Sequence, residues 1–255
     1  MKPMKQLNAD KLRVNVYETR AAMGAAAGQA AAVRIRQLLE EKAEVNIIFA
    51  AAPSQNETLD TLVAAEGIDW ARVNAFHMDE YVGLSADAPQ GFGNFLTEHL
   101  FGRLPFGRVF RLDPSAKDPQ AECARYSALL KQYPVDLVCL GIGENGHLAF
   151  NDPGEAKFDD PEVVKVVKLD EVCRQQQVND GCFKAIDEVP THALTLTIPT
   201  LMSAGHLVCT VPAATKCEAV SLTVNGPVTD MVPATAMRSH SDAVMFCDAD
   251  SGAKL

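Results

Sequence analysis

Short apolar runs alternate with longer stretches of good helix formers along this chain. Apolar runs bounded by turn residues are typical of buried strands, and Ala-rich or mixed stretches favour helices. Strands alternating with helices indicate an α/β fold, with a mainly parallel sheet covered by helices on both faces. The strands are predicted at residues 12–17, 45–51, 73–78, 135–142, 163–169, 193–198, 206–211 and 243–247. The helices are predicted at residues 20–42, 57–66, 94–101, 118–131, 170–183, 200–204 and 213–224.

The length of the chain favours one domain, residues 1–255, over several. Its 255 residues are 47% hydrophobic, which is ample for one large core. The sequence shows no internal repeat and no linker. Two looser regions, residues 84–117 and 151–162, interrupt the regular pattern, and residues 102–117 are expected to be irregular. We expect both regions to be excursions over the functional site that could serve as a lid.

Charge and composition limit the classes of partner. A formal net charge of −10 argues against nucleic-acid binding, which needs clustered Lys and Arg, although a small phosphate-bearing substrate needs only a few cations. No apolar run approaches the ~20 residues of a membrane span, and the N-terminus lacks the apolar core of a signal peptide. We therefore expect a cytoplasmic protein with no membrane partner. Seven cysteines without a C-x-x-C pair fit reduced thiols there. A homo-oligomer is left open.

A glycine-rich turn follows the predicted strand at residues 135–142. Glycines let the backbone turn sharply and approach a ligand closely. Open α/β sheets place their sites just past the carboxyl ends of buried strands. This turn is therefore the first candidate for a functional site. It contains Gly141, Gly143 and Gly146, followed by His147, Asn151 and Asp152.

Two other interpretations of this turn remain open. The spacing of Gly141, Gly143 and Gly146 matches the dinucleotide-binding fingerprint G-x-G-x-x-G. That fingerprint requires a long helix next, but Pro153 and Gly154 arrive too soon for one. The other alternative is a tight strand-to-loop turn that carries a surface histidine.

Adjacent acids, Asp79 and Glu80, stand at the end of the predicted strand 73–78. Neighbouring residues on a strand point to opposite faces, so we expect one carboxylate to enter the site and the other to pair with the scaffold. The alternation does not say which, and two solvated acids are the alternative. We expect His77 either to stabilise the fold or to contact and position a residue of the site without touching the ligand.

Cationic and polar groups follow other strands. Lys216 lies in the first turn of a predicted helix after strand 206–211, a position suited to an anion. Arg174 precedes three glutamines, and Arg suits bidentate contact with phosphate. Ser54 and Gln55, in the turn after strand 45–51, could donate to a phosphate too. The alternative is that Lys216 and Arg174 are ordinary exposed helix residues.

The sequence contains no motif for a metal site or for nucleophilic catalysis by serine. The six histidines are scattered, without the spacing of a metal site, so no metal ligand is predicted. A G-x-S-x-G nucleophile motif is also absent from the sequence. The remaining groups support acid–base chemistry without a cofactor.

Two segments together resemble the glucosamine-6-phosphate deaminase/isomerase family. They are residues 76–84 (FHMDEYVGL) and 140–153 (LGIGENGHLAFNDP), and the similarity continues through the turn at Lys216. The resemblance implies a Rossmann-like α/β sheet and a reaction without a cofactor. In that reaction an amino-sugar 6-phosphate, glucosamine 6-phosphate above all, becomes fructose 6-phosphate and ammonia.

The resemblance also implies residue roles. Asp79 matches the base that moves a proton between C2 and C1, and His147 matches the group that opens the sugar ring, because an imidazole can exchange protons near neutral pH. Asn145 and Asp152 match the positions that orient this histidine. Lys216 and Arg174 match phosphate contacts. The further residues expected to bind substrate are Ser54, Gln55, Gly143, Gly146 and Glu80.

Three positions depart from the family pattern. The turn at residues 50–56 is AAAPSQN, where the family usually has T-G-x-T-P. Asn145 stands where some members carry Asp, and Asp152 where many carry Glu. The alternatives are a hydrolase like 6-phosphogluconolactonase, which has a related fold, and a non-catalytic sugar-phosphate sensor. Sensors of that kind carry a helix-turn-helix, for which 255 residues leave no room.

Overall fold

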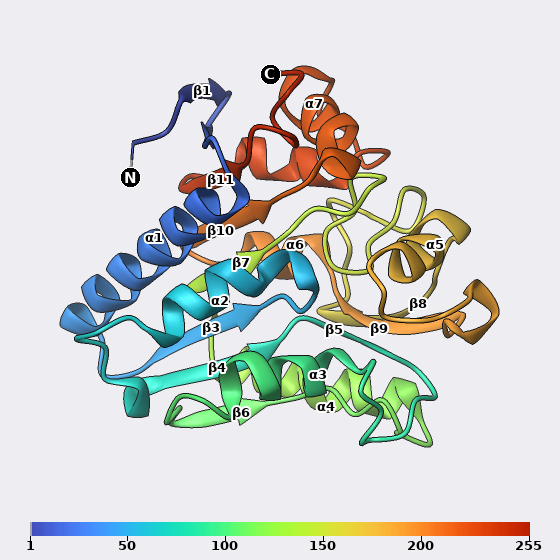
Figure 1. Cartoon of the computed structure of the whole chain (residues 1–255). Helices are drawn as coiled ribbons and strands as arrows, with labels where there is room; N and C mark the ends of the chain where they lie inside the picture. Colours follow the sequence, from blue (N-terminus) through green and yellow to red (C-terminus); the bar gives the residue numbers. More distant parts are fainter. Residues whose placement is uncertain (1) are drawn as a thin grey trace.

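An eight-stranded sheet, in the order β1-β2-β11-β10-β7-β3-β4-β6, forms the centre of the computed structural model, which describes residues 2–255 (Figure 1). Every neighbouring pair is parallel except β1 and β2, which form an antiparallel hairpin at one edge. The mainly parallel sheet is thus confirmed. Its strands are β1 (Lys5–Ala9), β2 (Leu12–Val16), β3 (Val45–Phe49), β4 (Val73–His77), β6 (Arg108–Phe110), β7 (Leu137–Leu140), β10 (His206–Val211) and β11 (Ala243–Cys247).

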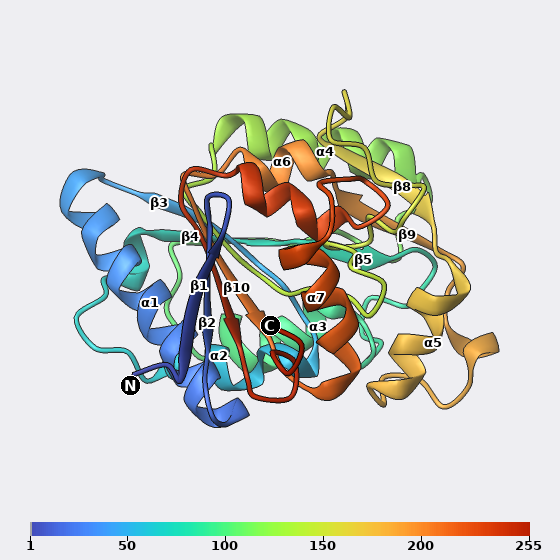
Figure 2. The ribbon, with the colours of Figure 1, turned by 90° about the horizontal axis from the view of Figure 1, so that it is seen from above.

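Helices cover both faces of this sheet, as predicted. One layer contains α1 (Arg20–Glu41), α2 (Asn56–Val63) and α3 (Phe92–Leu96). The other contains α4 (Pro119–Gln132), α6 (Ile198–Met202) and α7 (Cys217–Asn225). Seen from above, α4 and α6 lie on the opposite side of the sheet from α1 and α2 (Figure 2). The fold is therefore a three-layer α/β arrangement.

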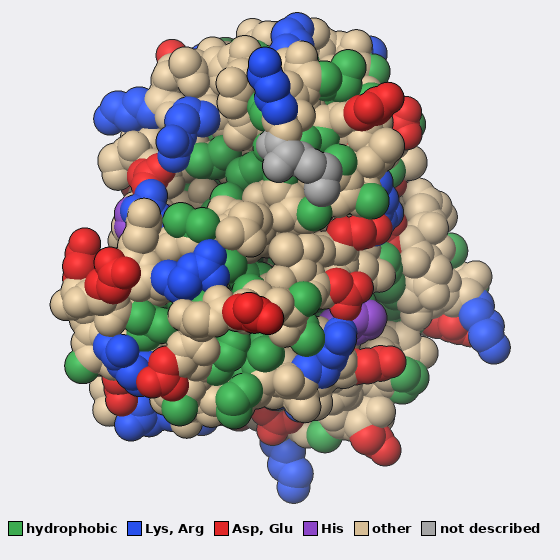
Figure 3. Space-filling model, turned by 60° about the vertical axis from the view of Figure 1, so that its left-hand side comes forward, with side chains coloured by type: hydrophobic (Ala, Val, Ile, Leu, Met, Phe, Trp, Pro, Cys, Tyr) green, Lys and Arg blue, Asp and Glu red, His purple; other side chains and the backbone are tan. Residues whose placement is uncertain are grey.

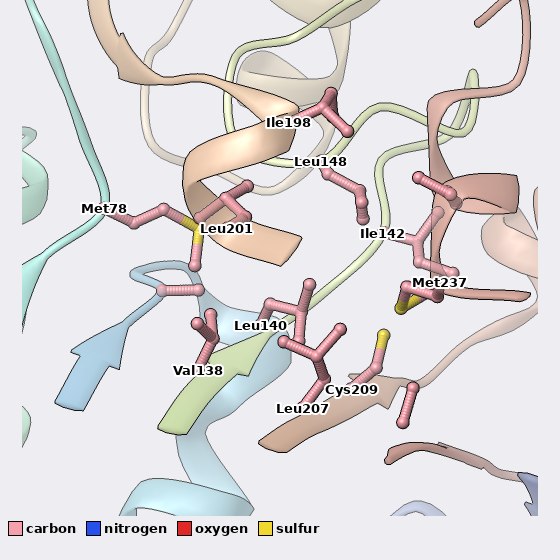
Figure 4. Packing of buried hydrophobic residues seen from close by; sticks show 14 of the residues in the cluster. Met78, Val138, Leu140, Ile142, Leu148, Ile198, Leu201, Leu207, Cys209 and Met237 are labelled. Atoms are coloured by element: carbon pink, nitrogen blue, oxygen red, sulfur yellow. The ribbon is translucent and has the colours of Figure 1, made fainter. Parts of the chain in front are cut away.

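A hydrophobic core lies on each face of the main sheet, and the alternation of side chains along the central strand β7 explains why there are two. Val138 and Leu140 belong to the core under α4, α6 and α7, and Leu137 and Cys139 belong to the core under α1, α2 and α3. Successive side chains of a strand point to opposite faces, so a strand buried on both faces must be apolar throughout. Val138 and Leu140 pack beneath Leu201 of α6 (Figure 4).

A second, three-stranded sheet corrects the sequence prediction. The strands predicted at residues 163–169 and 193–198 do not join the parallel sheet. They are β8 (Val164–Lys168) and β9 (His192–Leu196), and they pair antiparallel with each other. Strand β5 (Asp79–Tyr81), which directly follows β4 along the chain, pairs antiparallel with β9. Helix α5 (Glu171–Asn179) follows β8 and lies beyond this sheet, at the right of Figure 1.

Several elements were missed or misplaced. Strand β1 reads KQLNA and β6 is only three residues long, so neither carries the apolar run of a central strand. Both lie at edges of the sheet, where one side has no partner strand. Within residues 84–117, α3 and a π-helical turn (Thr97–Phe101) occupy the place of the helix predicted at residues 94–101, whereas β6 was not expected. Residues 151–162 form turns, and a lid movement of either region stays a prediction.

The surface agrees with the mixed charge of the sequence. Basic and acidic side chains are interspersed on the face shown in Figure 3 rather than gathered into one basic patch. Within residues 2–255, the helices are too short or too polar to cross a membrane.

Candidate active site

Asp79 and His147 line the same small cavity of about 50 Å³ at the carboxyl ends of the parallel strands. Asp79 begins β5, just past the end of β4, and His147 follows β7. In a parallel sheet the carboxyl ends of all strands lie along one edge, so the segments that follow them meet there. Ser54, Gln55 and Gly143 also line this cavity. The structure therefore brings together five of the residues singled out in the sequence.

Glycine at position 143 is required by the imidazole of His147. A Cβ atom placed on Gly143 would lie 2.2–2.3 Å from three ring atoms of His147. The backbone N–H of Gly143 donates to the carbonyl of His147 at 2.9 Å, and Gly146 has a φ of +84°, which favours glycine. The turn thus wraps tightly around the histidine ring.

Asp152 lies against the same ring. Its Oδ1 lies 3.0 Å from Nδ1 of His147. Asn145 donates from Nδ2 to Oδ1 of Asp152 at 3.0 Å, and its Oδ1 accepts the backbone N–H of His147 at 3.1 Å. Asn145 and Asp152 therefore hold the histidine in place from two sides.

The pKa of Asp152 is lowered despite burial. Burial by itself would raise the pKa, but His147, Asn145 and the backbone N–H of Asp170 outweigh it. Asn145 also donates to Oδ2 of Asp170 at 3.2 Å, and Asp170 caps the first turn of α5 by accepting the N–H of Cys173. The network that orients His147 therefore ties the glycine turn to α5.

Asp79 and Glu80 face different surroundings, as strand alternation predicted, and the structure decides which acid enters the cavity. Glu80 is completely buried and accepts the backbone N–H groups of Tyr81, Phe92 and Gly93 at 2.9–3.1 Å. It is not among the residues that line the cavity with Asp79. Burial, and then the charge of Glu80, raise the pKa of Asp79 well above its ordinary value.

His77 lies behind this pair, as expected for a structural residue. It is fully buried, and its Nδ1 accepts the backbone N–H of Leu112 at 3.2 Å. Burial lowers the pKa of His77 to about 3. The ring is therefore neutral at physiological pH, and its Nε2 lies 3.5 Å from Oε2 of Glu80.

Lys216 is a buried cation rather than an exposed helix lysine. Only 4% of the residue is exposed, and Nζ has no hydrogen-bond partner within residues 2–255. Burial lowers the pKa of Lys216, while the charges of Asp180 and Glu144 act in the opposite direction. Glu144 belongs to the glycine turn, so Lys216 lies beside that turn without lining the cavity. An unpaired buried ammonium is costly unless an anion joins it.

The side chain of Gln55 ties the turn after β3 to strand β10. The Nε2 of Gln55 lies 3.2 Å from Oγ of Ser54 and 3.4 Å from the carbonyl of Thr210, which joins this turn to β10. Ala52 has a φ of 146° and Ala213, just before Lys216, a φ of 80°, a region that favours glycine. The two loops that flank the cavity therefore both carry backbone strain.

Arg174 is not brought into the cavity. Its Nη2 donates to the carbonyls of Ile186 and Val189 at 2.6 and 2.9 Å. It lines a separate hollow together with Asp152 and Lys168. In this structure Arg174 thus holds the segment after α5 in place and lies apart from Asp79 and His147.

Several residues that shape the cavity were not predicted from the sequence. Gln176 and Gln177 of α5 line it, and Oε1 of Gln176 accepts the backbone N–H of Glu144 at 2.9 Å. The run of three glutamines after Arg174 was the signal that could have found them. Phe92 and Phe150 form an apolar wall. Single aromatic residues give no comparable signal in a sequence.

A larger hollow, of about 730 Å³, lies at the amino ends of β10 and β11, away from these groups. Arg13, Arg34 and His206 converge there on Asp242, at 2.5–2.8 Å. Its charged side chains are therefore paired with one another. The smaller cavity at the carboxyl ends is the better candidate for chemistry, because it contains a carboxylate and an imidazole free to face a ligand.

One side-chain cluster was not expected from spacing. Ligand atoms of His147, Asp152 and Cys173 all lie within 4.8 Å of one another, and all three residues are buried. These are side chains that bind zinc in proteins. No metal site was predicted because Cys173 lies on α5, far along the chain from the loop that carries His147 and Asp152.

Comparison with known proteins identifies the family. The family described as glucosamine-6-phosphate isomerases/6-phosphogluconolactonase matches residues 18–246. The chain belongs to this family. A glucosamine-6-phosphate deaminase of Lactobacillus delbrueckii subsp. bulgaricus is 39% identical over 200 residues, covering 78% of this chain and 83% of that protein. One of Listeria innocua is 34% identical over 229 residues, covering 90% and 96%.

Solved structures of the family share the fold. A monomeric glucosamine-6-phosphate deaminase superposes with a TM-score of 0.87 at 29% identity, covering 95% of this chain and 99% of that one. The 6-phosphogluconolactonase of Thermotoga maritima superposes with a TM-score of 0.76 at 19% identity, covering 93% and 100%. The second comparison shows the fold alone. The predicted family and fold are thus confirmed.

Proposed function

We propose that this chain is an isomerising deaminase that converts glucosamine 6-phosphate and water into fructose 6-phosphate and ammonia. The observation that carries the proposal is the shared cavity of Asp79 and His147. Relatives named glucosamine-6-phosphate deaminase, at 34–39% identity over most of the chain, support the same reaction.

The two groups would divide the proton transfers between them. The imidazole of His147 would move a proton between the ring oxygen and the C1 oxygen, which opens the sugar. The carboxylate of Asp79 would take the proton from C2 and return it to C1, while the C1 oxygen gains a proton and the C2 amine loses one, leaving an imine at C2. Water then hydrolyses the imine to a ketone and ammonia. A carboxylate whose pKa is raised is a stronger base than an ordinary one, and the pKa of Asp79 is raised by burial and by Glu80.

The substrate phosphate would meet Lys216, supported by Ser54 and Gln55. Lys216 is a buried ammonium with no partner within residues 2–255, and an anionic ligand would supply one. Gly143 and Gly146 would act on the substrate only through His147, because the imidazole fills the space beside Gly143 and Val232 the space beside Gly146. We propose no direct contact for Glu80, whose carboxylate is occupied by three backbone N–H groups.

Substrate entry would require α5 to move. The cavity measures about 50 Å³ in this structure, with Gln176 and Gln177 facing it. Ligand sites usually measure about 300–1,000 Å³. We therefore propose that α5 and the segment after it swing outward. Arg174 could contact phosphate only after leaving its carbonyl partners at Ile186 and Val189.

The test is the release of ammonia and fructose 6-phosphate from glucosamine 6-phosphate by the purified protein, without an added cofactor. Galactosamine 6-phosphate in parallel would identify the epimer that the cavity accepts. Hydrolysis of 6-phosphogluconolactone without deamination would replace the proposal with a lactonase. Stabilisation by hexose phosphates with no turnover of either substrate would indicate a sensor.

A further inference from the structure

Cys173 is a buried thiol in the first turn of α5 that meets the catalytic candidates. It is completely buried, and its Sγ lies within 4.8 Å of a carboxylate oxygen of Asp152. Its Sγ, an oxygen of Asp152 and a ring nitrogen of His147 all lie within 4.8 Å of one another. The loop after β7, which carries His147 and Asp152, and helix α5, which carries Cys173, therefore bring one nitrogen, one oxygen and one sulfur close together.

The distances suit a tetrahedral ion. Zinc binds sulfur at about 2.3 Å and nitrogen or oxygen at about 2.0–2.2 Å, which places ligand atoms roughly 3.3–3.8 Å apart. The Nδ1 atom of His147 and Oδ1 of Asp152 are 3.0 Å apart, so a small separation would admit the ion. The side chain of His147 is 10% exposed, and its Nδ1 has no aligned hydrogen-bond partner within residues 2–255.

The charges of the three side chains, and the contacts that orient Asp152, favour a divalent cation at this point. A carboxylate, a thiolate and a neutral imidazole would together neutralise Zn²⁺, so the occupied site would carry no net charge within the buried cluster. The oxygens of Asp152 are already oriented by Asn145 at 3.0 Å and by the N–H of Asp170 at 3.4 Å. Such contacts fix the direction of metal ligands.

We propose that His147, Asp152 and Cys173 form a Zn²⁺-binding site, and that bound zinc inhibits the enzyme. On binding, the Cys173 thiol releases its proton to solvent and forms a bond to zinc, with no change of oxidation state. Zinc on Nδ1 separates His147 from Asp152 and fixes the ring. The inhibition rests on the proposed function, whereas the site itself does not.

Binding is tested by spectroscopy, independently of activity. Co²⁺ added to the metal-free protein should give an intense near-ultraviolet thiolate-to-metal band, which Zn²⁺ should abolish. Cys173→Ser should lose the band and bind Zn²⁺ at least tenfold more weakly in competition with a chromophoric chelator. Cys182→Ser, a matched control at a partly buried thiol just beyond α5, should keep both properties. A band that survives in Cys173→Ser, or none in the unmodified protein, would overturn the site.

X-ray absorption at the zinc edge keeps the test valid if Cys173→Ser does not fold. One sulfur at about 2.3 Å with nitrogen and oxygen at about 2.0 Å is expected, and a shell without sulfur contradicts the assignment. Zn²⁺ should also suppress ammonia release from glucosamine 6-phosphate, and a chelator should restore it. If zinc binds through sulfur but turnover is unchanged, inhibition is overturned and the site stands. If the metal-free protein turns over no amino-sugar phosphate, the proposed function fails instead.

Discussion

Asp79 lines the cavity while its neighbour Glu80 is turned away and held by three backbone N–H groups. The two carboxylates are adjacent in sequence and both almost completely buried. Because the fixed charge of Glu80 adds to the burial of Asp79, both act to raise the pKa of Asp79. Asp79 is thus the carboxylate that can act as a base in the cavity, and Glu80 is the one that stabilises the fold.

Replacing Asp79 with Asn should abolish most of the turnover. Removing a general base typically costs about 10²–10⁴-fold in rate, and the amide keeps the shape of the site. We expect kcat to fall by roughly that factor, with KM changed by no more than about threefold. Steady-state ammonia release measures both, and exposed Asp87→Asn is the control. Retention of most of the activity in Asp79→Asn would show that another group is the base.

Stability should respond to the ionisation of Asp79. Its pKa is raised in the folded protein, so at intermediate pH the fold retains a proton that the unfolded chain has released. That stabilisation is complete below the unfolded pKa of about 3.9 and is lost as pH rises through the folded pKa. Asp79→Asn should therefore become increasingly more stable than the unmodified protein as pH rises. Urea unfolding across a pH series checks this, and a pH-independent difference would contradict it.

The contribution of Asp152 to folding stability should depend on pH in the opposite direction. Its pKa is lowered in the fold, because its contacts with His147, Asn145 and Asp170 outweigh burial. The stabilisation is present above the unfolded pKa and is lost as pH falls through the folded pKa. Asp152→Asn should therefore be less stable at neutral pH, with the difference shrinking in acid. The same unfolding series measures it, and a deficit that grows in acid would exclude this explanation.

Gly143→Ala should displace the imidazole of His147. The new Cβ would lie 2.2–2.3 Å from the ring, so the ring or the turn must move. Overpacking of this kind costs about 1–3 kcal/mol, and we expect at least a tenfold loss of kcat because the ring leaves Asp152. Gly205→Ala is the control, since its nearest neighbour would be 3.5 Å away. Full activity in Gly143→Ala would mean that the turn adapts easily.

Lys216→Met should stabilise the protein while weakening substrate binding. The ammonium is buried without a partner within residues 2–255, and an apolar side chain of similar length removes its desolvation cost. We expect a gain of roughly 1–3 kcal/mol, or about 2–12 °C in Tm. KM for glucosamine 6-phosphate should rise at least tenfold. A destabilised variant with unchanged KM would show that Lys216 serves the fold instead.

The hydrophobic pattern determined the main sheet, because a strand buried on both faces must be apolar along its length. Strands such as β3 and β7 were therefore predictable, as was the alternation with helices. Edge strands β1 and β6 were not, because a strand with one free side needs no apolar run. The antiparallel pairing of β8 with β9 was equally hidden, since periodicity gives no strand direction.

The two motifs in the sequence also singled out Asp79 and His147 and the residues that accompany them. Only the tertiary structure decided which acid of the 79–80 pair faces the cavity, and that Arg174 lies outside it. It alone brought Cys173 to Asp152 and His147, and left Lys216 buried without a partner within residues 2–255. The physical reason is that strand ends far apart in the chain meet at one edge of a parallel sheet. Local patterns fix the strands, but the contacts between the loops beyond them depend on how the whole chain packs.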